Sequence, residues 1–306
     1  MIPAAARSAL EALLGERVAF GVPLARHTAL RIGGPADALA QPADRDELLR
    51  LLRLCAAHGL PHHVLGSGFN TLVLDGGVEG VVLQLGRFRG LEEKPAGALR
   101  VAAGVSHATL TSFCIRQGLA GLEFGAGIPG SMGGWAAMNV GIGVRELKDV
   151  LLEAEVASGD GTTLEALDPA ALQPCYRGLA GLPPGAVIVS TLLRVTPADP
   201  LAVRAEVERL RAHRAATQPL DLPSCGSVFK NPPGDFAGRL IEAAGLKGLR
   251  AGEAEISPLH ANFIVNHGGA RAADVLALIE RAQAAVAERF GARLEPEVRV
   301  VGRTTA

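Results

Sequence analysis

Two glycine-rich stretches contain the residues whose spacing most clearly suggests ligand chemistry. The residues GAGIPG at 125–130 match the dinucleotide-binding pattern G-x-G-x-x-G, in which glycines let the backbone approach a pyrophosphate. The residues LGSGFN at 65–70 form a second loop of the same character. Tight turns and close packing explain either loop alone equally well. Together with Asn70 and Asn139, the two loops favour an extended ligand that carries phosphate.

The surroundings of GAGIPG differ from those of a Rossmann fold. That fold requires a long hydrophobic strand directly before the first glycine and a helix directly after the third. The preceding residues GLAGLEF are short and interrupted by glycine, and Pro129 has no N–H to donate. Gly133 and Gly134 would weaken a helix after the loop. The sequence therefore predicts a phosphate-binding loop on a different fold.

The elements that must position these loops follow an α+β pattern. Residues 42–61 predict a helix, because Asp44 is a favourable N-cap and Gly59 and Pro61 stop the helix. Further helices are expected at 106–119, 200–216 and 272–291, and strands at 64–66, 71–75, 80–85, 98–104, 186–195 and 294–302. Short strands therefore flank the loop at 65–70.

Composition and charge narrow the class of protein. With 306 residues, 48% hydrophobic and 20% charged, the chain is globular and long enough for two or three domains. The net charge of −1 argues against binding to nucleic acid. The four cysteines are too far apart for a zinc knuckle or a disulfide scaffold, so we expect no metal site. Without a signal peptide or a membrane span, a soluble cytoplasmic protein is expected.

Eight blocks of the chain resemble the UDP-N-acetylenolpyruvoylglucosamine reductase family and occur in the order found in that family. The blocks are 27–37, 65–82, 125–141, the pair Tyr176-Arg177, 217–232, 244–248, 256–266 and 294–302. They span nearly the whole chain. No long extra segment follows Tyr176, so the chain is similar to the shorter of the two subclasses of this family.

The resemblance implies an α+β fold with a two-subdomain FAD-binding module of the vanillyl-alcohol oxidase type and a C-terminal substrate-binding domain. We expect residues 1–82 and 83–202 to form the two subdomains and residues 203–293 the substrate-binding domain. The strand at 294–306 is expected to pack back on the FAD module.

The family makes UDP-N-acetylmuramate for peptidoglycan, and hence for cell wall biogenesis, cell shape and cell division. The resemblance implies that NADPH gives a hydride to FAD and leaves. UDP-N-acetylglucosamine enolpyruvate would then accept the hydride at its vinyl carbon. FAD is expected to be non-covalent, because neither glycine loop contains histidine or cysteine. We expect the chain to act as a cytoplasmic monomer with this small molecule as its partner.

Hydride addition to the vinyl carbon creates an enolate, which requires a positive charge at the substrate carboxylate and a proton for the adjacent carbon. By the resemblance, Arg177 binds the carboxylate through two hydrogen bonds and Ser227 protonates the enolate. Glu297, with a raised pKa, would stabilise the developing charge. The family motif matches Glu297 rather than Glu295, because Arg299 follows two residues later.

The resemblance also assigns residues to the two ligands. The expected FAD-binding residues are Gly66, Ser67, Gly68, Phe69, Asn70, Thr71, Gly127, Ile128, Pro129, Gly130, Ser131, Gly133, Gly134, Asn139, Gly141 and Arg299. The expected substrate-binding residues are Tyr176, Gln218, Lys230, Asn231, Lys247, His260 and Asn262. The sequence departs from the family pattern beside these residues, at Trp135, Ile142-Gly143-Val144 and Gly178.

Each of these assignments has a simpler alternative when the residue is taken alone. Arg177 could be a surface arginine, Ser227 could shape a turn, and Glu297 could be an outward charge on a strand. Lys230 could polarise Ser227 or be solvated, and His260 could be a buried structural histidine. Two other functions stay open: an oxidase of the same flavin fold, which would react with oxygen without NADPH, and a binding protein without catalysis.

Overall fold

The structure, a computed structural model, describes residues 2–304, which form two compact units. Unit 1 contains Met1–Phe20, Ala38–Gly66 and Gly80–His213, and unit 2 contains Gly21–Asp37, Ser67–Glu79 and Arg214–Ala306. These units cut across the three predicted ranges, and residues 1, 305 and 306 of those ranges lie outside the described residues. A four-stranded sheet has the order β1 (Val18–Pro23), β2 (Pro35–Ala40), β5 (Val78–Leu83) and β3 (His62–Val64). The unit boundaries fall within three of these strands.

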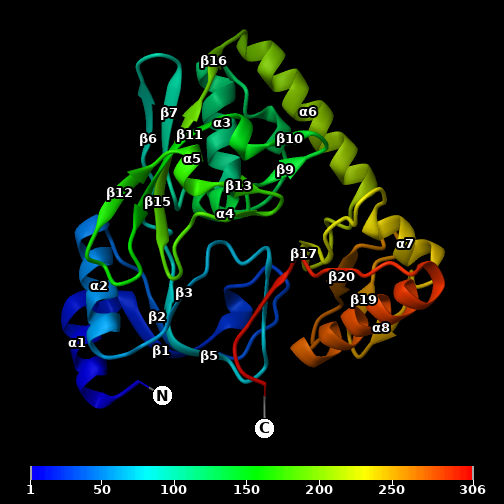
Figure 1. The fold of residues 1–306 in the computed structure, drawn as a ribbon, viewed down its shortest axis with the longest axis horizontal. Coiled ribbons are helices and arrows are strands. Elements are labelled where there is room, and N and C mark those ends of the chain that lie inside the picture. The colour runs from blue at the N-terminus through cyan, green and yellow to red at the C-terminus, as the bar shows by residue number, and fades with distance from the viewer. Residues whose placement is uncertain (1, 305–306) are drawn as a thin grey trace. The chain divides into compact units, whose positions relative to one another are not determined.

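Unit 1 contains a five-stranded antiparallel sheet, whose strands are labelled in Figure 1. Its strands in spatial order are β12 (Leu164–Leu167), β11 (Leu151–Ala157), β15 (Val187–Arg194), β7 (Ala98–Ala102) and β6 (Leu91–Lys94). Helices α3 (His107–Gln117) and α4 (Met132–Ala137) contribute Leu110, Cys114, Met132 and Trp135 to the hydrophobic core beneath this sheet. The predicted strands at 98–104 and 186–195 and the predicted helix at 106–119 are confirmed.

A second hydrophobic core of unit 1 lies under α1 (Ala4–Leu14) and α2 (Arg45–Ala57), which pack against each other. The predicted leucines 48, 51 and 52 all face this core and are fully buried. Asp44 caps α2 as predicted, because its side chain accepts the Glu47 N–H at 2.9 Å. A helix with this cap and this apolar face forms where the sequence predicts it.

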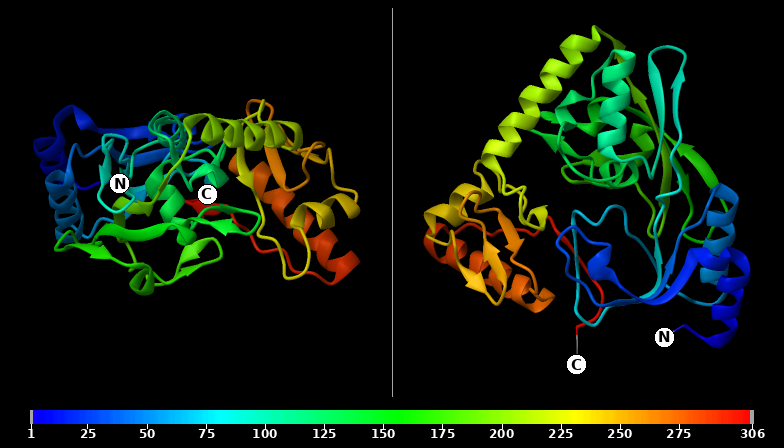
Figure 2. Two further views of the ribbon diagram at one scale, coloured as in Figure 1. Left: turned by 90° about the horizontal axis from the view of Figure 1, so that it is seen from above. Right: turned by 180° about the vertical axis from the view of Figure 1, so that it is seen from behind.

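The remaining elements of unit 1 are short. They are η1 (Gly15–Arg17), β8 (Leu119–Ala120), η3 (Glu123–Gly125), β9 (Gly141–Ile142), β10 (Arg145–Glu146), η4 (Leu147–Asp149), α5 (Pro169–Leu172), β13 (Pro174–Cys175), β14 (Gly178–Leu179) and β16 (Thr196–Pro197). The predicted helix at 200–216 is confirmed as the long helix α6 (Pro200–Thr217), visible in both views of Figure 2.

Unit 2 contains the antiparallel sheet β17 (Ser224–Ser227), β20 (Phe263–Asn266), β19 (Ala254–Ile256) and β18 (Arg250–Ala251). Helix α8 (Ala272–Phe290) lies along this sheet, contacts β18 and β19, and also packs against α7 (Ala237–Ala243) (Figure 1). The predicted apolar stripe of α8 is confirmed, since Val275, Leu278, Ile279, Ala282 and Val286 are all buried. Near the N-terminus of the chain, η2 (Leu24–Arg26) also belongs to this unit.

The chain end returns to pair with an early strand. Strand β21 (Arg299–Val301) pairs in parallel with β4 (Thr71–Val73), in register Arg299 to Thr71. The strand predicted over 294–302 is therefore shorter than expected. Pro296, which has no N–H, forms only an isolated bridge with Phe229. The residues before Arg299 bond singly to another segment instead of continuing a ladder.

The region around GAGIPG agrees with one sequence argument and contradicts another. The short 3-10 helix η3 precedes the loop where a Rossmann fold has a long strand, as expected. The expectation that Gly133 and Gly134 would weaken a following helix is wrong, because α4 begins at Met132. Packing overrides propensity at this point: a Cβ on Gly133 would lie 3.0 Å from the Ala103 Cβ, so glycine permits this close approach.

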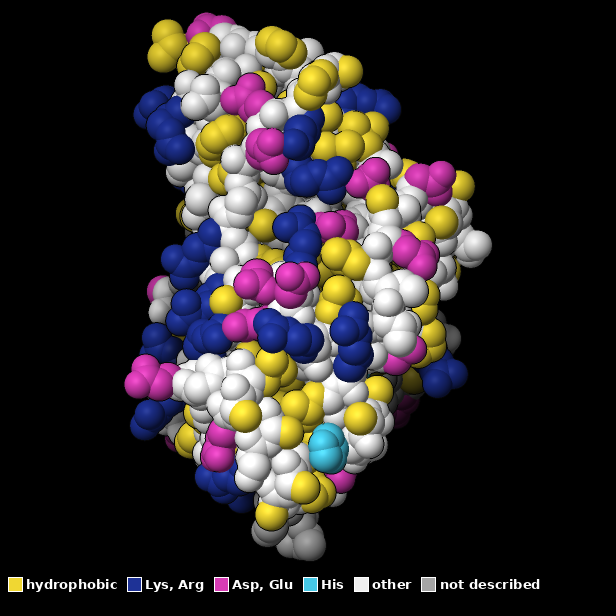
Figure 3. Space-filling view, turned by 90° about the vertical axis from the view of Figure 1, so that its left-hand side faces the viewer, with side chains coloured by type: hydrophobic (Ala, Val, Ile, Leu, Met, Phe, Trp, Pro, Cys, Tyr) yellow, Lys and Arg dark blue, Asp and Glu magenta, His cyan; other side chains and the backbone are white. Residues whose placement is uncertain are grey.

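Acidic and basic side chains are interspersed over the face seen in Figure 3. Some of these charges form ion pairs: in unit 1, Arg45 pairs with Glu155 at 2.6 Å and Arg100 with Glu153 at 2.8 Å. Within residues 2–304, each helix is too short or too polar to span a bilayer.

Candidate active site

Ser227 lies at the end of β17, directly after an irregularity in the sheet. Ser224 pairs with Val265 and Ser227 with Phe263, so β17 has one more residue between these pairs than β20. Gly226 has a φ of +81°, which side-chain-bearing residues adopt only with strain. Such bulges bend a strand and redirect the following side chain. The bulge therefore presents Ser227 at the surface of a cavity.

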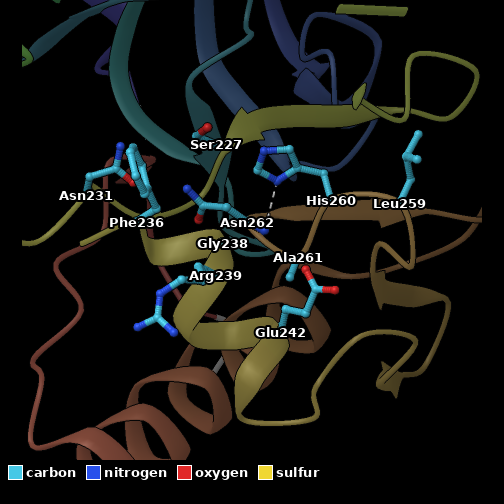
Figure 4. A pocket seen from close by; sticks show the side chains of 10 residues that line it. All are labelled: Ser227, Asn231, Phe236, Gly238, Arg239, Glu242, Leu259, His260, Ala261 and Asn262. Atoms are coloured by element: carbon cyan, nitrogen blue, oxygen red, sulfur yellow. Dashed lines mark hydrogen bonds between the residues drawn. The ribbon is translucent and has the colours of Figure 1, made fainter. Parts of the chain in front are cut away.

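This cavity has a volume of about 430 Å³ and belongs entirely to unit 2. It is lined by Ser227, Asn231, Phe236, Gly238, Arg239, Glu242, Leu259, His260, Ala261 and Asn262. Figure 4 shows Ser227 and His260 on one side, Asn231 beside Phe236, and Arg239 and Glu242 on α7. Phe236 and Leu259 are 67% and 50% exposed. Two exposed apolar side chains and several polar groups therefore surround one cavity, as in many ligand sites.

Asn262 holds the chain next to Ser227. Its amide N–H donates to the Phe229 carbonyl at 2.8 Å, and its amide oxygen accepts the Phe229 N–H at 2.9 Å. Its own carbonyl accepts the Val228 N–H at 2.8 Å. Asn262 and Phe229 are both buried. Asn262 thus lines the cavity, and its side-chain amide is engaged with the Phe229 backbone.

His260 is half-buried against the same cavity. Its Nδ1 accepts the N–H of Asn262 at 3.2 Å, so the neutral ring carries its proton on Nε2. Burial lowers the pKa of His260 below its ordinary value, and the nearby Lys247 charge adds to this effect. The ring also packs edge-on against Phe263, with centroids 4.8 Å apart. His260 is therefore a neutral imidazole with a fixed tautomer, lining the cavity rather than enclosed in the core.

Backbone hydrogen bonds bring the chain end to this site. The Glu297 N–H donates to the Val228 carbonyl at 2.8 Å, one residue from Ser227. The Asn70 amide donates to the Glu297 carbonyl at 3.0 Å, and the Arg299 N–H donates to the Asn70 carbonyl at 3.1 Å. Three segments that are distant in sequence are thus joined. They carry the predicted catalytic residues Ser227 and Glu297 and the predicted flavin residue Asn70.

The other predicted polar residues of unit 2 have protein partners. Lys230 forms an ion pair with Glu295 at 2.7 Å, and Lys247 forms one with Glu242 at 2.8 Å. Glu295, the other glutamate of the EPE stretch, is therefore the ion-pair partner of Lys230. The Gln218 side-chain oxygen accepts a hydrogen bond from Arg214 at 2.6 Å.

Arg214 is a candidate that the sequence analysis did not single out. Its Nε–H is buried and has no hydrogen-bond partner within residues 2–304. Burial also lowers the pKa of its guanidinium. A buried donor on a cation is costly unless a ligand satisfies it, so Arg214 is suited to an anionic group. In the sequence, its only signal is its position one helical turn before Gln218.

Arg177 lies in unit 1, in a two-residue turn between β13 and β14. Its φ of +61° is in the left-handed region, where residues with side chains are uncommon. Its guanidinium donates to the Gly141 carbonyl at 3.3 Å and lies over the Tyr176 ring, 5.0 Å from the centroid. Strained backbone of this kind often accompanies functional residues. In this turn Arg177 is half-buried.

Asn139 ties two segments near Arg177 together. Its amide nitrogen donates to the Cys175 carbonyl and to the Glu146 carboxylate, both at 3.0 Å. Its amide oxygen accepts the Lys148 N–H at 2.9 Å, and the residue is 1% exposed. Asn139 therefore fixes the hairpin that carries Arg177. The flavin contact that the sequence predicts for Asn139 stays a prediction. Within unit 1, its side chain joins the segments at Cys175, Glu146 and Lys148.

The glycine loop of unit 1 is fixed to the segment after β7. The His107 N–H donates to the Gly130 carbonyl at 3.1 Å, and the Met132 N–H donates to the Val105 carbonyl at 2.9 Å. Gly130 has a φ of +129°. A Cβ on Gly66 would lie 2.9 Å from the Ser131 Oγ, so Gly66 approaches this loop closely. Glycine is required here for both backbone conformation and space.

In unit 2, Gly68 shows the same requirement. Its φ is +69°, and a Cβ would lie 2.3 Å from the His27 carbonyl oxygen. Gly68 is buried, whereas Gly66 is exposed and Gly130 partly exposed, so in unit 1 these two glycines offer backbone without side chains, as a dinucleotide phosphate needs. The residues present fit an FAD site.

Comparison with known proteins decides the family. The chain is 51% identical over 280 residues to the UDP-N-acetylenolpyruvoylglucosamine reductase of Anaeromyxobacter sp. (strain K), covering 92% of this chain and 84% of the relative. The chain belongs to the UDP-N-acetylenolpyruvoylglucosamine reductase family. Residues 218–301 match the family model of the C-terminal domain of UDP-N-acetylenolpyruvoylglucosamine reductase, and residues 36–167 match an FAD binding domain. A UDP-N-acetylenolpyruvoylglucosamine reductase 2 of Symbiobacterium thermophilum is 47% identical over 287 residues, 94% of this chain and 92% of the relative.

Solved structures agree with this family. The reductase of Thermus caldophilus is 39% identical, has a TM-score of 0.80, and covers 92% of this chain and 98% of its own. An alkyldihydroxyacetonephosphate synthase, at 16% identity, has a TM-score of 0.50 over 64% of this chain and 44% of its own, and shows the fold alone. The predicted fold, a vanillyl-alcohol oxidase type FAD module with a C-terminal domain, is confirmed. The chain is an FAD-dependent oxidoreductase.

Proposed function

We propose that this chain reduces UDP-N-acetylglucosamine enolpyruvate to UDP-N-acetylmuramate, a step of peptidoglycan precursor synthesis, with NADPH as hydride donor. The observation that carries the proposal is the cavity lined by Ser227, Asn231 and His260, together with the hydrogen bonds that join Val228 to Glu297 and Glu297 to Asn70. Membership of the reductase family supports the choice of substrate. When bound, FAD supplies the capacity to take a hydride from NADPH and give it to the vinyl carbon.

Ser227 is the proposed acid. After hydride addition to the terminal carbon, the adjacent carbon carries the electron pair of an enolate and requires one proton. The Ser227 hydroxyl gives this proton and recovers one from solvent. A free serine is a weak acid, so catalysis depends on its position beside that carbon. The bulge at Gly226 and the anchoring of Val228 by Asn262 supply this fixed position.

Arg177 and Glu297 are the proposed groups for the carboxylate end of the substrate. The guanidinium of Arg177 binds the carboxylate and stabilises the negative charge that moves onto it during the reaction. Glu297, whose N–H donates to the Val228 carbonyl and whose carbonyl accepts the Asn70 side-chain amide, donates from its protonated form to the same developing charge. Arg177→Lys keeps the charge but loses the planar pair of donors, so we expect a large fall in kcat.

The remaining predicted residues bind the nucleotide sugar and the cofactor. We propose that the Nε2–H of His260 and the amide of Asn231 donate to the UDP-sugar. Lys230, Lys247, Gln218 and Tyr176 are proposed to bind the same ligand. Arg214, with a buried donor lacking a protein partner within residues 2–304, is added to these groups as a site for an anionic oxygen. FAD is proposed to bind without a covalent bond at the two glycine stretches.

Functional domains 1–82, 83–202 and 203–293, with residues 294–306 returning to the first of them, stay part of this proposal. We also propose that the protein acts as a monomer in the cytoplasm and binds neither nucleic acid nor membrane. The pairing of β21 with β4 supports the return of the chain end.

The experiment is a flavin spectrum followed by two additions. The purified protein with FAD should show a flavin spectrum that NADPH bleaches, and UDP-N-acetylglucosamine enolpyruvate should restore it much faster than oxygen does. A protein that stays colourless with FAD would contradict the proposal. Fast restoration by oxygen, with none by the enolpyruvyl substrate, would instead indicate an oxidase.

A further inference from the structure

Trp135, the single tryptophan of the chain, lies in the first turn of α4, just after the glycine loop, and is 3% exposed. We propose that Trp135 is a positioning residue that fixes the course of loop 125–130, and that Gly125 is a glycine because of the indole and not because of a ligand. This inference rests on the proposed function in one respect: the loop whose course is fixed is the one proposed to hold FAD.

The indole contacts the loop at three points. Its Nε1–H donates to the Pro129 carbonyl at 3.3 Å. A Cβ on Gly130 would lie 3.3 Å from its Cδ1, and a Cβ on Gly125 would lie 2.0 Å from its Cη2 and 2.5 Å from its Cζ3. The indole therefore spans the loop from its first glycine to its third.

The indole is also in contact with two rings outside the glycines of the loop, of which His107 covers one face. His107 stacks on Trp135 with ring centroids 4.4 Å apart and an interplanar angle of 19°. His107 is itself held by a 2.7 Å hydrogen bond between its Nε2 and the Thr111 Oγ1, and both residues are 6% exposed. Phe124 lies tilted against the indole, at 6.5 Å between centroids. Because the indole is enclosed on these sides, a side chain at Gly125 would displace the loop rather than the ring.

The backbone separates Gly125 from the other glycines of the loop. Gly127 and Gly130 have φ values of +81° and +129°, so their backbone conformations favour glycine whatever surrounds them. Gly125 ends the 3-10 helix η3 and is not among the glycines with a positive φ. Its requirement for glycine is therefore steric, and it comes from Trp135. A smaller ring at position 135 should remove that requirement.

The test is a double-mutant cycle of Gly125→Ala and Trp135→Phe, with two measurements on each protein. The melting temperature of the protein without FAD reports loop packing, and the Kd for FAD reports the ligand. A phenyl ring is shorter than an indole and leaves room for one methyl group. We expect Gly125→Ala alone to lower the melting temperature by several degrees and to raise the Kd for FAD at least tenfold. In the Trp135→Phe protein, the same change should shift the Kd less than twofold and the melting temperature little.

Gly86→Ala is the matched control in both backgrounds, because no atom of residues 2–304 lies within 4 Å of a Cβ at Gly86 and its φ is not positive. Equal effects of Gly125→Ala with Trp135 and with Phe at position 135 would overturn the inference. If Gly125→Ala lowers the melting temperature only when Trp135 is present, the inference is supported. If the Kd for FAD is also unchanged in every protein, FAD does not bind at this loop. Where Gly125→Ala fails to fold, folding of the double variant supports the inference and its failure to fold overturns it.

Discussion

Replacing Asn262 by alanine should destabilise the protein more than most single substitutions. The Asn262 amide satisfies both the N–H and the carbonyl of Phe229, at 2.9 and 2.8 Å. Phe229 is 2% exposed and Asn262 is 4% exposed, so both Phe229 backbone groups are largely shielded from bulk water. Alanine would leave one buried donor and one buried acceptor without partners.

The magnitude follows from these two groups. Each buried polar group left unsatisfied costs about 1–3 kcal/mol, so Asn262→Ala should lower the free energy of unfolding by about 2–6 kcal/mol. That is a large part of the roughly 5–15 kcal/mol of a typical domain. Urea unfolding followed by circular dichroism measures the loss. We also expect kcat to fall more than KM rises, because Phe229, two residues after Ser227, loses the side-chain amide that holds its backbone.

Asn231→Ala is the matched control. Asn231 lines the same cavity but is exposed, and its side-chain oxygen accepts the Ala237 N–H at 3.0 Å. Asn231→Ala leaves one buried donor, the Ala237 N–H, without this partner, so it should cost about 1–3 kcal/mol, less than the loss of both partners of Phe229. A loss below about 1 kcal/mol for Asn262→Ala, or one no larger than that of Asn231→Ala, would refute the reasoning that buried backbone depends on this amide.

Three further predictions concern stability and reactivity. Asp75 accepts the Ala272 and Ala273 N–H groups at 3.0 and 3.2 Å, so Asp75→Ala should cost about 0.5–2 kcal/mol in urea unfolding, whereas Asp75→Asn should cost less. Because the pKa of His260 is lowered from 6.5 in the folded state, the unfolded chain binds more protons near and below that pH; stability should rise with pH through this window, and His260→Gln should flatten the rise. Cys175 is exposed, whereas burial raises the pKa of the other three thiols to about 11 or 12, so a disulfide reagent at pH 8 should label one thiol in native protein and none in Cys175→Ser.

Local sequence signals predicted the regular elements well. Asp44 with Gly59 and Pro61 located α2, and the apolar period of 272–291 located α8 with its buried face. The signals failed where tertiary contacts decide the outcome. Helix α4 forms despite two glycines because the Gly133 backbone packs on Ala103, and strand β21 is short because Pro296 interrupts the ladder.

The candidate site was accessible from sequence only in part. The glycine spacing indicated a phosphate loop, but no local pattern shows that the Trp135 indole leaves no room for a side chain at Gly125. The sequence also proposed Asn262 and Asn139 as ligand contacts. Their engagement with backbone atoms at Phe229 and Cys175 depends on long-range pairing, which a single sequence does not reveal. Arg214 was missed for the same reason, since its burial is a property of the folded chain.

The central claim is that Ser227 protonates the substrate of a flavin reductase, and single-turnover kinetics of Ser227→Ala test it most directly. In stopped flow, NADPH should bleach the flavin of the variant at nearly the wild-type rate, because Ser227 takes no part in that step. Reoxidation by UDP-N-acetylglucosamine enolpyruvate should be slower by about 10²-fold or more, the typical contribution of proton transfer from a positioned acid. Reoxidation at the wild-type rate would contradict the claim and remove Ser227 from the mechanism.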